Sequence, residues 1–161
     1  MSDERLTHED EAGRLRMVDV GHKPPMHRRA VARGRVFAPA FALDRLESGD
    51  LPKGEGLAAA RIAGVLAAKR CDELIPLCHT LPLDAVQVDF RRAEPGVLEI
   101  EATATITART GVEMEALTAV SMSALTIWDM LKGITADLRI GEVVLVEKTK
   151  RAVDGADDRG A

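Results

Sequence analysis

Two neighbouring stretches of alternating side chains constrain the fold of this chain most strongly. In residues 86–90, and again in residues 98–106, apolar side chains alternate with polar or charged ones. Because successive residues of a strand point to opposite faces, both stretches predict strands with one face in water. The Glu-Pro-Gly sequence at residues 94–96 supplies a turn between them. The pattern therefore predicts an antiparallel β-hairpin.

The segment before the hairpin is expected to be helical. Residues 57–70 are rich in alanine and leucine, which have high helix propensity, and Ile62, Val65 and Leu66 place an apolar stripe along them. Residues 40–47 form a shorter candidate helix, which a Ser-Gly-Asp sequence ends. Two consecutive helices, the first of them short, are therefore expected.

A longer helix is expected after the hairpin. Thr110 and Glu113 fit the capping-box pattern, in which a threonine oxygen and a glutamate three residues later satisfy free backbone donors. No proline interrupts residues 116–132, and Gly133 offers an end to the helix. The β-branched residues that follow, at 140–146, predict a last strand.

With an extended segment at residues 29–37, the order becomes strand, helix, helix, strand, strand, helix, strand. This is the split βαβ order of ferredoxin-like α+β folds with an extra short helix. We therefore expect an antiparallel sheet with helices packed on one face. Because 161 residues suit one domain, a single domain is expected over residues 17–152, between flexible tails at 1–16 and 153–161.

Composition and charge exclude several classes of protein. The net charge of −4 and the 2% aromatic content argue against a nucleic-acid binder. No apolar stretch approaches the roughly 20 residues of a membrane span, and residues 1–16 lack the apolar core of a secretory signal, so a cytoplasmic location is expected. The six-residue gap between Cys71 and Cys78 matches no common zinc spacing. No metal or cofactor is therefore expected.

Four arginines close together could meet an anionic ligand. Arg28, Arg29, Arg33 and Arg35 fall within eight residues of the first expected strand. The alternative is an edge strand whose charges prevent aggregation. The arginines alone do not separate these interpretations.

Asp129 and Lys132 form a candidate catalytic pair. They are three residues apart, so on a helix they point to the same side. An acid beside an amine allows proton transfer in both directions, because each shifts the pKa of the other. The alternative is an ordinary surface ion pair.

Two loops add further candidates. Lys53 stands in a glycine-flanked turn directly before a helix, where backbone donors and the positive helix end suit phosphate. The alternative is a flexible surface loop. His79 follows Cys78 in a loop between Pro76 and Pro82, where it could move protons near neutral pH. The alternative is a partly buried, hydrogen-bonded histidine.

The length of the last helix limits how these candidates combine. Glu113, Met114 and Glu115 open that helix, and Asp129 lies sixteen residues after Glu113. At 1.5 Å per residue this separation is roughly 24 Å, more than one nucleotide-sized ligand would comfortably cover. If both ends of the helix serve one site, two chains are expected to build it.

Taken together, six ordered blocks resemble the molybdenum-cofactor biosynthesis protein C family over residues 6–148. They are Met17–Val20, Ala60–Gly64, Ala68–Arg70, Ile75–His79, Thr110–Ala119 and Ile127–Met130. The resemblance implies a lyase that converts 3',8-cyclo-7,8-dihydroguanosine 5'-triphosphate to cyclic pyranopterin monophosphate with release of pyrophosphate. It also implies a ferredoxin-like subunit, a homohexamer built as a trimer of dimers, active sites at dimer interfaces, and no required metal.

The resemblance also assigns residues by position. The catalytic residues are Asp129, Lys53 and Lys132. The substrate-binding residues are Leu77, Cys78, His79, Glu113, Met114 and Glu115, with Arg28, Asp19 and Lys148 on the phosphate side.

This chain departs from the family pattern at two places. Thr80 stands where the family usually has proline, and residues 147–151 replace a glycine-rich basic loop, so Lys150 could take the role of Lys148.

Two other functions remain possible from the sequence. A ferredoxin-like regulatory module could bind a small metabolite without reacting it, and its fold would look the same. A pterin or GTP-ring hydrolase would be expected to need a metal. The clustered Lys53, Asp129 and Lys132 favour an enzyme over the binding module.

Overall fold

The computed structural model describes residues 14–153. The expected tails at 1–16 and 153–161 lie mostly outside these residues, and the domain boundaries stay a prediction. The elements are β1 (Met26–Phe37), α1 (Ala40–Ser48), α2 (Gly56–Lys69), α3 (Cys71–Leu74), β2 (Ala85–Glu94), β3 (Val97–Ala108), α4 (Glu113–Leu131) and β4 (Arg139–Arg151).

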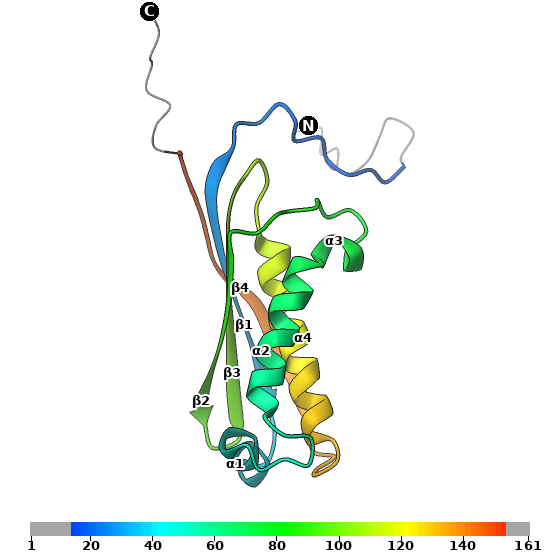
Figure 1. Ribbon diagram of the computed structural model, residues 1–161, viewed down its shortest axis with the longest axis vertical. Helices are drawn as coiled ribbons and strands as arrows, with labels where there is room; N and C mark the ends of the chain where they lie inside the picture. The colour runs from blue at the N-terminus through cyan, green and yellow to red at the C-terminus, as the bar shows by residue number, and fades with distance from the viewer. Residues whose placement is uncertain (1–13, 154–161) are drawn as a thin grey trace, which may run out of the picture.

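The four strands form one antiparallel sheet with the order β2-β3-β1-β4. Helices α2 and α4 lie side by side against one face of this sheet (Figure 1). This is the ferredoxin-like α+β arrangement that the order of elements predicted, with α1 as the extra short helix. The four-residue helix α3 was not predicted.

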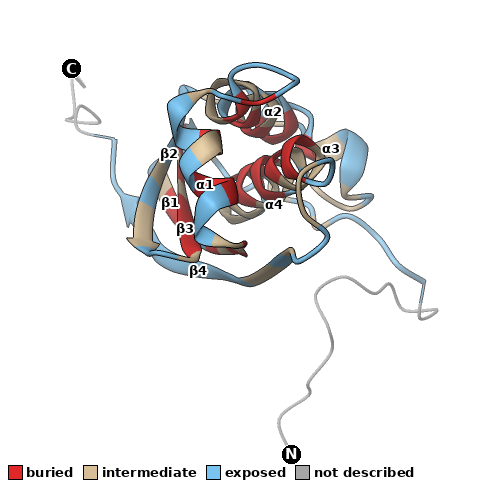
Figure 2. Ribbon diagram, turned by 90° about the horizontal axis from the view of Figure 1, so that it is seen from below, coloured by how far each residue is buried: buried red, intermediate tan, exposed pale blue. Residues whose placement is uncertain are grey.

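The hairpin is present where the alternation placed it. Leu98, Ile100 and Ala102 of β3 are buried beneath the helices, whereas Glu101 and Thr103 at alternate positions are only partly buried. Glu99, the other alternate residue, is 7% exposed because Arg35 and Arg91 pair with it. Figure 2 shows the buried residues on the inner sides of α2 and α4 and on the strands they cover. The core therefore lies between one sheet face and two helices, as period-2 alternation requires.

Small residues join α2 to α4, which corrects the apolar stripe expected on α2. Ser123 Oγ donates a 3.0 Å hydrogen bond to the carbonyl of Ala60. A Cβ atom on Gly64 would lie only 2.3 Å from Ser123 Oγ. The helices thus approach too closely for large side chains, and Ile62 and Leu66 face outward, 62% and 47% exposed.

Two local expectations are wrong. The residue that caps α4 is Val112, and no side chain hydrogen-bonds to that end of the helix, so the capping box does not form. Glu113 instead pairs with Lys148 of β4. Strand β1 lies between β3 and β4 rather than at an edge, which overturns the edge-strand interpretation of the arginines.

The arginines of β1 mostly pair with carboxylates of the neighbouring strands. Arg33 bonds Glu101 at 2.7 Å, and Arg35 bonds Glu142 at 2.7 Å. These pairs lie on the sheet face that the helices leave open, so most of the positive charge of β1 is neutralised locally. Among the described residues, no helix is long and apolar enough to span a membrane.

Candidate functional site

The three residues expected to be catalytic meet at the C-terminal end of α4. Lys53 Nζ lies 2.6 Å from Asp129 Oδ2, and Lys132 Nζ lies 2.6 Å from Asp129 Oδ1. Lys53 also donates a 3.1 Å hydrogen bond to the backbone carbonyl of Asp129. The structure therefore joins a loop lysine, 76 residues away in sequence, to the predicted helix pair.

Local backbone geometry carries Lys53 to this place. The turn between α1 and α2 is closed by a 2.9 Å hydrogen bond from Gly54 N to the Leu51 carbonyl. Gly54 has a φ of 86°, a left-handed conformation that disfavours side chains. The turn faces the last turn of α4, where helix carbonyls lack internal partners and attract a cation.

The electrostatics of this cluster keep Asp129 ionised. Hydrogen bonds from Lys132 and then Lys53 lower the pKa of Asp129 to about 2. All three side chains are about half exposed, with exposed fractions of 48%, 50% and 59% for Lys53, Asp129 and Lys132. A solvent-borne substrate can therefore reach a carboxylate held between two ammonium groups.

A second group of expected residues surrounds a cavity of about 580 Å³ at the opposite end of α4. The six residues expected to bind substrate all line it: Leu77, Cys78, His79, Glu113, Met114 and Glu115. The other residues of the wall were not expected site residues: Val18, Val20, Lys23, Ile75, Leu81, Thr110 and Gly111. The first two belong to the Met17–Val20 block, which was a usable signal, whereas nothing marked Lys23.

His79 is held by a specific contact. Its Nε2 lies 2.8 Å from the backbone carbonyl of Val18. A carbonyl oxygen only accepts hydrogen bonds, so Nε2 carries the proton in this contact. The half-buried ring agrees with the hydrogen-bonded histidine that the sequence left as the alternative, and it also lines the cavity.

Glu115 is the buried carboxylate of this end. It is 2% exposed, and burial raises its pKa above the ordinary glutamate range. The Cys78 thiol donates to Glu115 Oε1 over 3.7 Å, and burial raises the pKa of Cys78 to about 12. This part of the cavity therefore favours uncharged side chains.

The three residues expected on the phosphate side are not gathered together. Lys148 pairs with Glu113, a residue of the cavity wall, and the choice between Lys148 and Lys150 stays a prediction. Asp19 accepts a 2.8 Å hydrogen bond from Gly21 N within a turn. Arg28 bonds the carbonyls of Ala108 and Arg109 instead, at 3.0 Å each.

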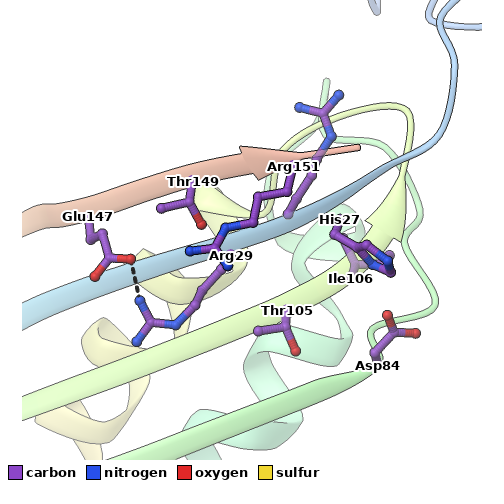
Figure 3. A pocket seen from close by; sticks show the side chains of 9 residues that line it. His27, Arg29, Asp84, Thr105, Ile106, Glu147, Thr149 and Arg151 are labelled. Atoms are coloured by element: carbon purple, nitrogen blue, oxygen red, sulfur yellow. Dashed lines mark hydrogen bonds and ion pairs between the residues drawn. The ribbon is translucent and has the colours of Figure 1, made fainter. Parts of the chain in front are cut away.

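Arg28 lines a separate hollow of about 460 Å³ on the open sheet face. Figure 3 shows Arg29 reaching Glu147 across this hollow, with Arg151 and His27 nearby. The walls of this hollow carry both signs of charge, because Asp84 and Glu147 line it together with Arg28, Arg29 and Arg151.

The two groups of site residues lie at opposite ends of one helix. The ends of α4 are far apart in Figure 1, and the sixteen residue steps from Glu113 to Asp129 span roughly 24 Å. One chain therefore presents an ionic cluster and a cavity that a single nucleotide-sized molecule would not bridge.

Comparison with known proteins decides the family. The MoaC family model matches residues 17–151, which contain both groups of site residues. The chain belongs to the MoaC family. The resemblance to the molybdenum-cofactor biosynthesis protein C family is thereby confirmed.

Similar proteins in this family share about half of their residues with the chain. The cyclic pyranopterin monophosphate synthase of Roseiflexus sp. strain RS-1 is 56% identical over 150 residues, covering 92% of this chain and 94% of that protein. The synthase of Thermomicrobium roseum is 55% identical over 144 residues, 89% and 87% of the two chains. Cyclic pyranopterin monophosphate synthase 1 of Mycobacterium tuberculosis is 53% identical over 144 residues, 89% and 85%.

Proposed function

We propose that this MoaC-family protein is a lyase of molybdenum-cofactor biosynthesis. It converts 3',8-cyclo-7,8-dihydroguanosine 5'-triphosphate to cyclic pyranopterin monophosphate and releases pyrophosphate. The observation that carries the proposal is the exposed cluster of Lys53, Asp129 and Lys132 in a chain whose relatives are named as the synthase. Those names give no support to a metabolite-binding module without catalysis.

The chemistry of the cluster suits the reaction. Opening the purine ring, rebuilding it as a pterin and closing a cyclic phosphate all require proton transfers. Asp129, ionised because its pKa is lowered to about 2, accepts hydrogen bonds from two ammonium groups that can donate protons. Loss of pyrophosphate leaves negative charge on the departing oxygens, which cations such as Lys53 stabilise.

The buried end of α4 has a different task in this scheme. Leu77, Cys78 and His79 lie with Met114 and Glu115 around a cavity that fits a ring system, and Glu113 lies beside Lys148 at its edge. These side chains hold the base portion of the substrate, while Arg28, Asp19 and Lys148 are placed on the phosphate side. The catalytic residues of the same chain lie too far away to act there.

A dimer would bring the two groups of site residues at opposite ends of α4 together. We place the working site at a dimer interface, where the cavity of one subunit meets the Lys53, Asp129 and Lys132 cluster of another, in a homohexamer built as a trimer of dimers. Large apolar side chains on the surface support assembly, among them Ile62 at 62%, Leu125 at 55% and Val144 at 50% exposed. A cytoplasmic location remains a prediction.

The direct test is turnover of the named substrate by the purified full-length chain. The expected result is equal amounts of pyrophosphate and cyclic pyranopterin monophosphate, measured by an enzyme-coupled phosphate assay and by mass spectrometry. GTP in place of the cyclised substrate is the matched control and should yield neither product. Release of formate without pyrophosphate would instead indicate the ring hydrolase, and an unchanged substrate would reject the proposed reaction.

A further inference from the structure

Two thiols and a carboxylate meet at the wall of the cavity. Cys71 begins α3, Cys78 lies in the following loop, and Glu115 lies in the first turn of α4. The two Sγ atoms are 3.9 Å apart, and Cys78 Sγ is 3.7 Å from Glu115 Oε1. One sulfur or oxygen atom from each residue lies within 4.8 Å of the others.

The carboxylate in this group has an unused oxygen. Glu115 is 2% exposed, as is Cys71. Among the described residues, Glu115 Oε2 is the buried side-chain oxygen or nitrogen without a hydrogen-bond partner. Buried polar atoms nearly always have a partner, because leaving one unpaired costs about 1–3 kcal/mol. Glu115 Oε1 contacts the Cys78 thiol, so Oε2 leaves the carboxylate with capacity for one more partner.

We propose that Cys71, Cys78 and Glu115 form a binding site for a thiophilic divalent cation, for which Zn²⁺ is the natural probe. Zinc binds thiolates at about 2.3 Å and carboxylates at about 2.0–2.2 Å in tetrahedral geometry. Two sulfurs on such an ion lie about 3.8 Å apart, close to the 3.9 Å seen here. Cys78 and Glu115 both line the cavity, which gives an ion a route to this group.

This site was not expected from the sequence. The six residues between Cys71 and Cys78 match no common zinc spacing. The third ligand comes from α4, 37 residues after Cys78, where no local motif connects it to the cysteines. A disulfide between the cysteines would account for the thiols but would leave Glu115 Oε2 unpaired. Coordination by both thiolates and the Glu115 carboxylate would engage all three groups, and it would release to solvent the two thiol protons together with the proton of Glu115 wherever that carboxyl is protonated.

The site has a consequence for activity that rests on the proposed function. Cys78 and Glu115 line the cavity, whereas Cys71 does not. Zinc bound here would hold two substrate-binding groups and so compete with the substrate. Cys71→Ser should therefore keep the activity of the metal-free enzyme while losing sensitivity to zinc.

The test measures metal binding directly and needs no turnover. Chelator-treated full-length protein is titrated with Co²⁺, and we expect thiolate-to-cobalt charge-transfer absorption that saturates at one ion per chain and disappears on addition of Zn²⁺. Cys71→Ser and Glu115→Gln should weaken binding at least about tenfold. Glu113→Gln, which changes the neighbouring carboxylate outside the cluster, should bind as wild type does.

A second measurement covers variants that fail to fold. In the wild-type protein, one equivalent of Zn²⁺ should protect both cysteines from alkylation, read by mass spectrometry. Alkylation that zinc does not slow, or cobalt binding without thiolate absorption, would overturn the site. A thiolate–cobalt spectrum in a protein that turns over no substrate would count against the proposed function alone.

Discussion

The two ends of α4 hold carboxylates of opposite character. Asp129 is half exposed between two lysines, and its pKa is lowered to about 2. Glu115 is buried without a cation, and its pKa is raised. The helix dipole would favour the reverse, because it stabilises anions at the N-terminal end by about 0.3–1 kcal/mol. Neighbouring charges and burial, which shift a pKa by about 1–3 units or more, outweigh it.

The two ends of α4 therefore offer different chemical environments to a substrate. In the proposed function, the exposed end holds a charged carboxylate for proton transfer, whereas burial at the other end favours the uncharged forms of Glu115 and Cys78 beside a ring system. Under the proposed function each end is incomplete as an active site, so we propose that assembly brings the two ends together.

The largest effect is expected at the exposed end. Asp129→Asn removes the carboxylate but keeps its shape, so turnover should fall by about 10²–10⁴-fold in steady-state assays of pyrophosphate release. Asp137→Asn, an exposed acid outside both groups, is the matched control and should keep full activity. Circular dichroism should show both variants folded. Near-normal turnover by Asp129→Asn would remove the central catalytic assignment.

Combining the two ends from different subunits should restore activity. Lys53→Ala and Glu113→Ala each disable one half of the site, so each should be inactive alone. In a symmetric dimer with interface sites, reassembly of an equal mixture should recover about a quarter of wild-type activity, because one site of each mixed dimer is intact. Absence of recovery at every ratio, with mixed dimers shown by native mass spectrometry, would place both residues in one chain's site.

Sequence patterns predicted the fold well because its signals are local. Alternation over residues 98–106 and an uninterrupted helix over residues 116–132 each follow from side-chain periodicity. The buried face of α2 was not predictable, because glycine and alanine at Gly64 and Ala60 face α4 only when the helices pack closely. The Thr110 cap failed for a similar reason: Lys148, 35 residues after Glu113, binds the glutamate.

Some residues of the candidate site were likewise predictable from local sequence patterns, and others were not. Asp129 and Lys132 are visible as a pair because helix spacing brings them together, but Lys53 joined them only through the family resemblance. Lys23 carried no signal, since its place in the cavity wall depends on the path of the chain before β1. The contact of Cys71 with Cys78 likewise depends on the short helix α3, which no pattern predicted.

The pH dependence of stability should distinguish the buried carboxyl of Glu115 from the exposed one of Asp129. Burial raises the pKa of Glu115 in the folded protein above its pKa in the unfolded chain. At a pH between these two pKa values, Glu115 takes up a proton when the protein folds. The free energy of unfolding therefore falls as the pH rises from the lower pKa to the higher one. Glu115→Gln should therefore raise the free energy of unfolding at pH 7 by roughly 1 kcal/mol, measured by urea denaturation of chelator-treated protein. The gain should shrink below about pH 4, where glutamate is protonated in both states. A destabilised variant at pH 7 would contradict the burial argument.

The smallest effect concerns which lysine controls Asp129. Its pKa is lowered first by the hydrogen bond from Lys132 and then by that from Lys53. Carboxyl-carbon NMR titration of Asp129 should therefore show a larger upward pKa shift in Lys132→Ala than in Lys53→Ala, and the largest in the double variant.

Because the folded pKa of Asp129 lies below that of an unfolded aspartate, the ionised carboxylate stabilises the wild-type fold above about pH 4. This stabilisation is lost as the pH falls toward 2. Lys69→Ala, an exposed lysine at the end of α2, is the control and should leave the titration unchanged. Equal pKa shifts in the two single variants would contradict this order. They would show that Lys53 of the loop lowers the pKa of Asp129 as much as Lys132 of the helix does.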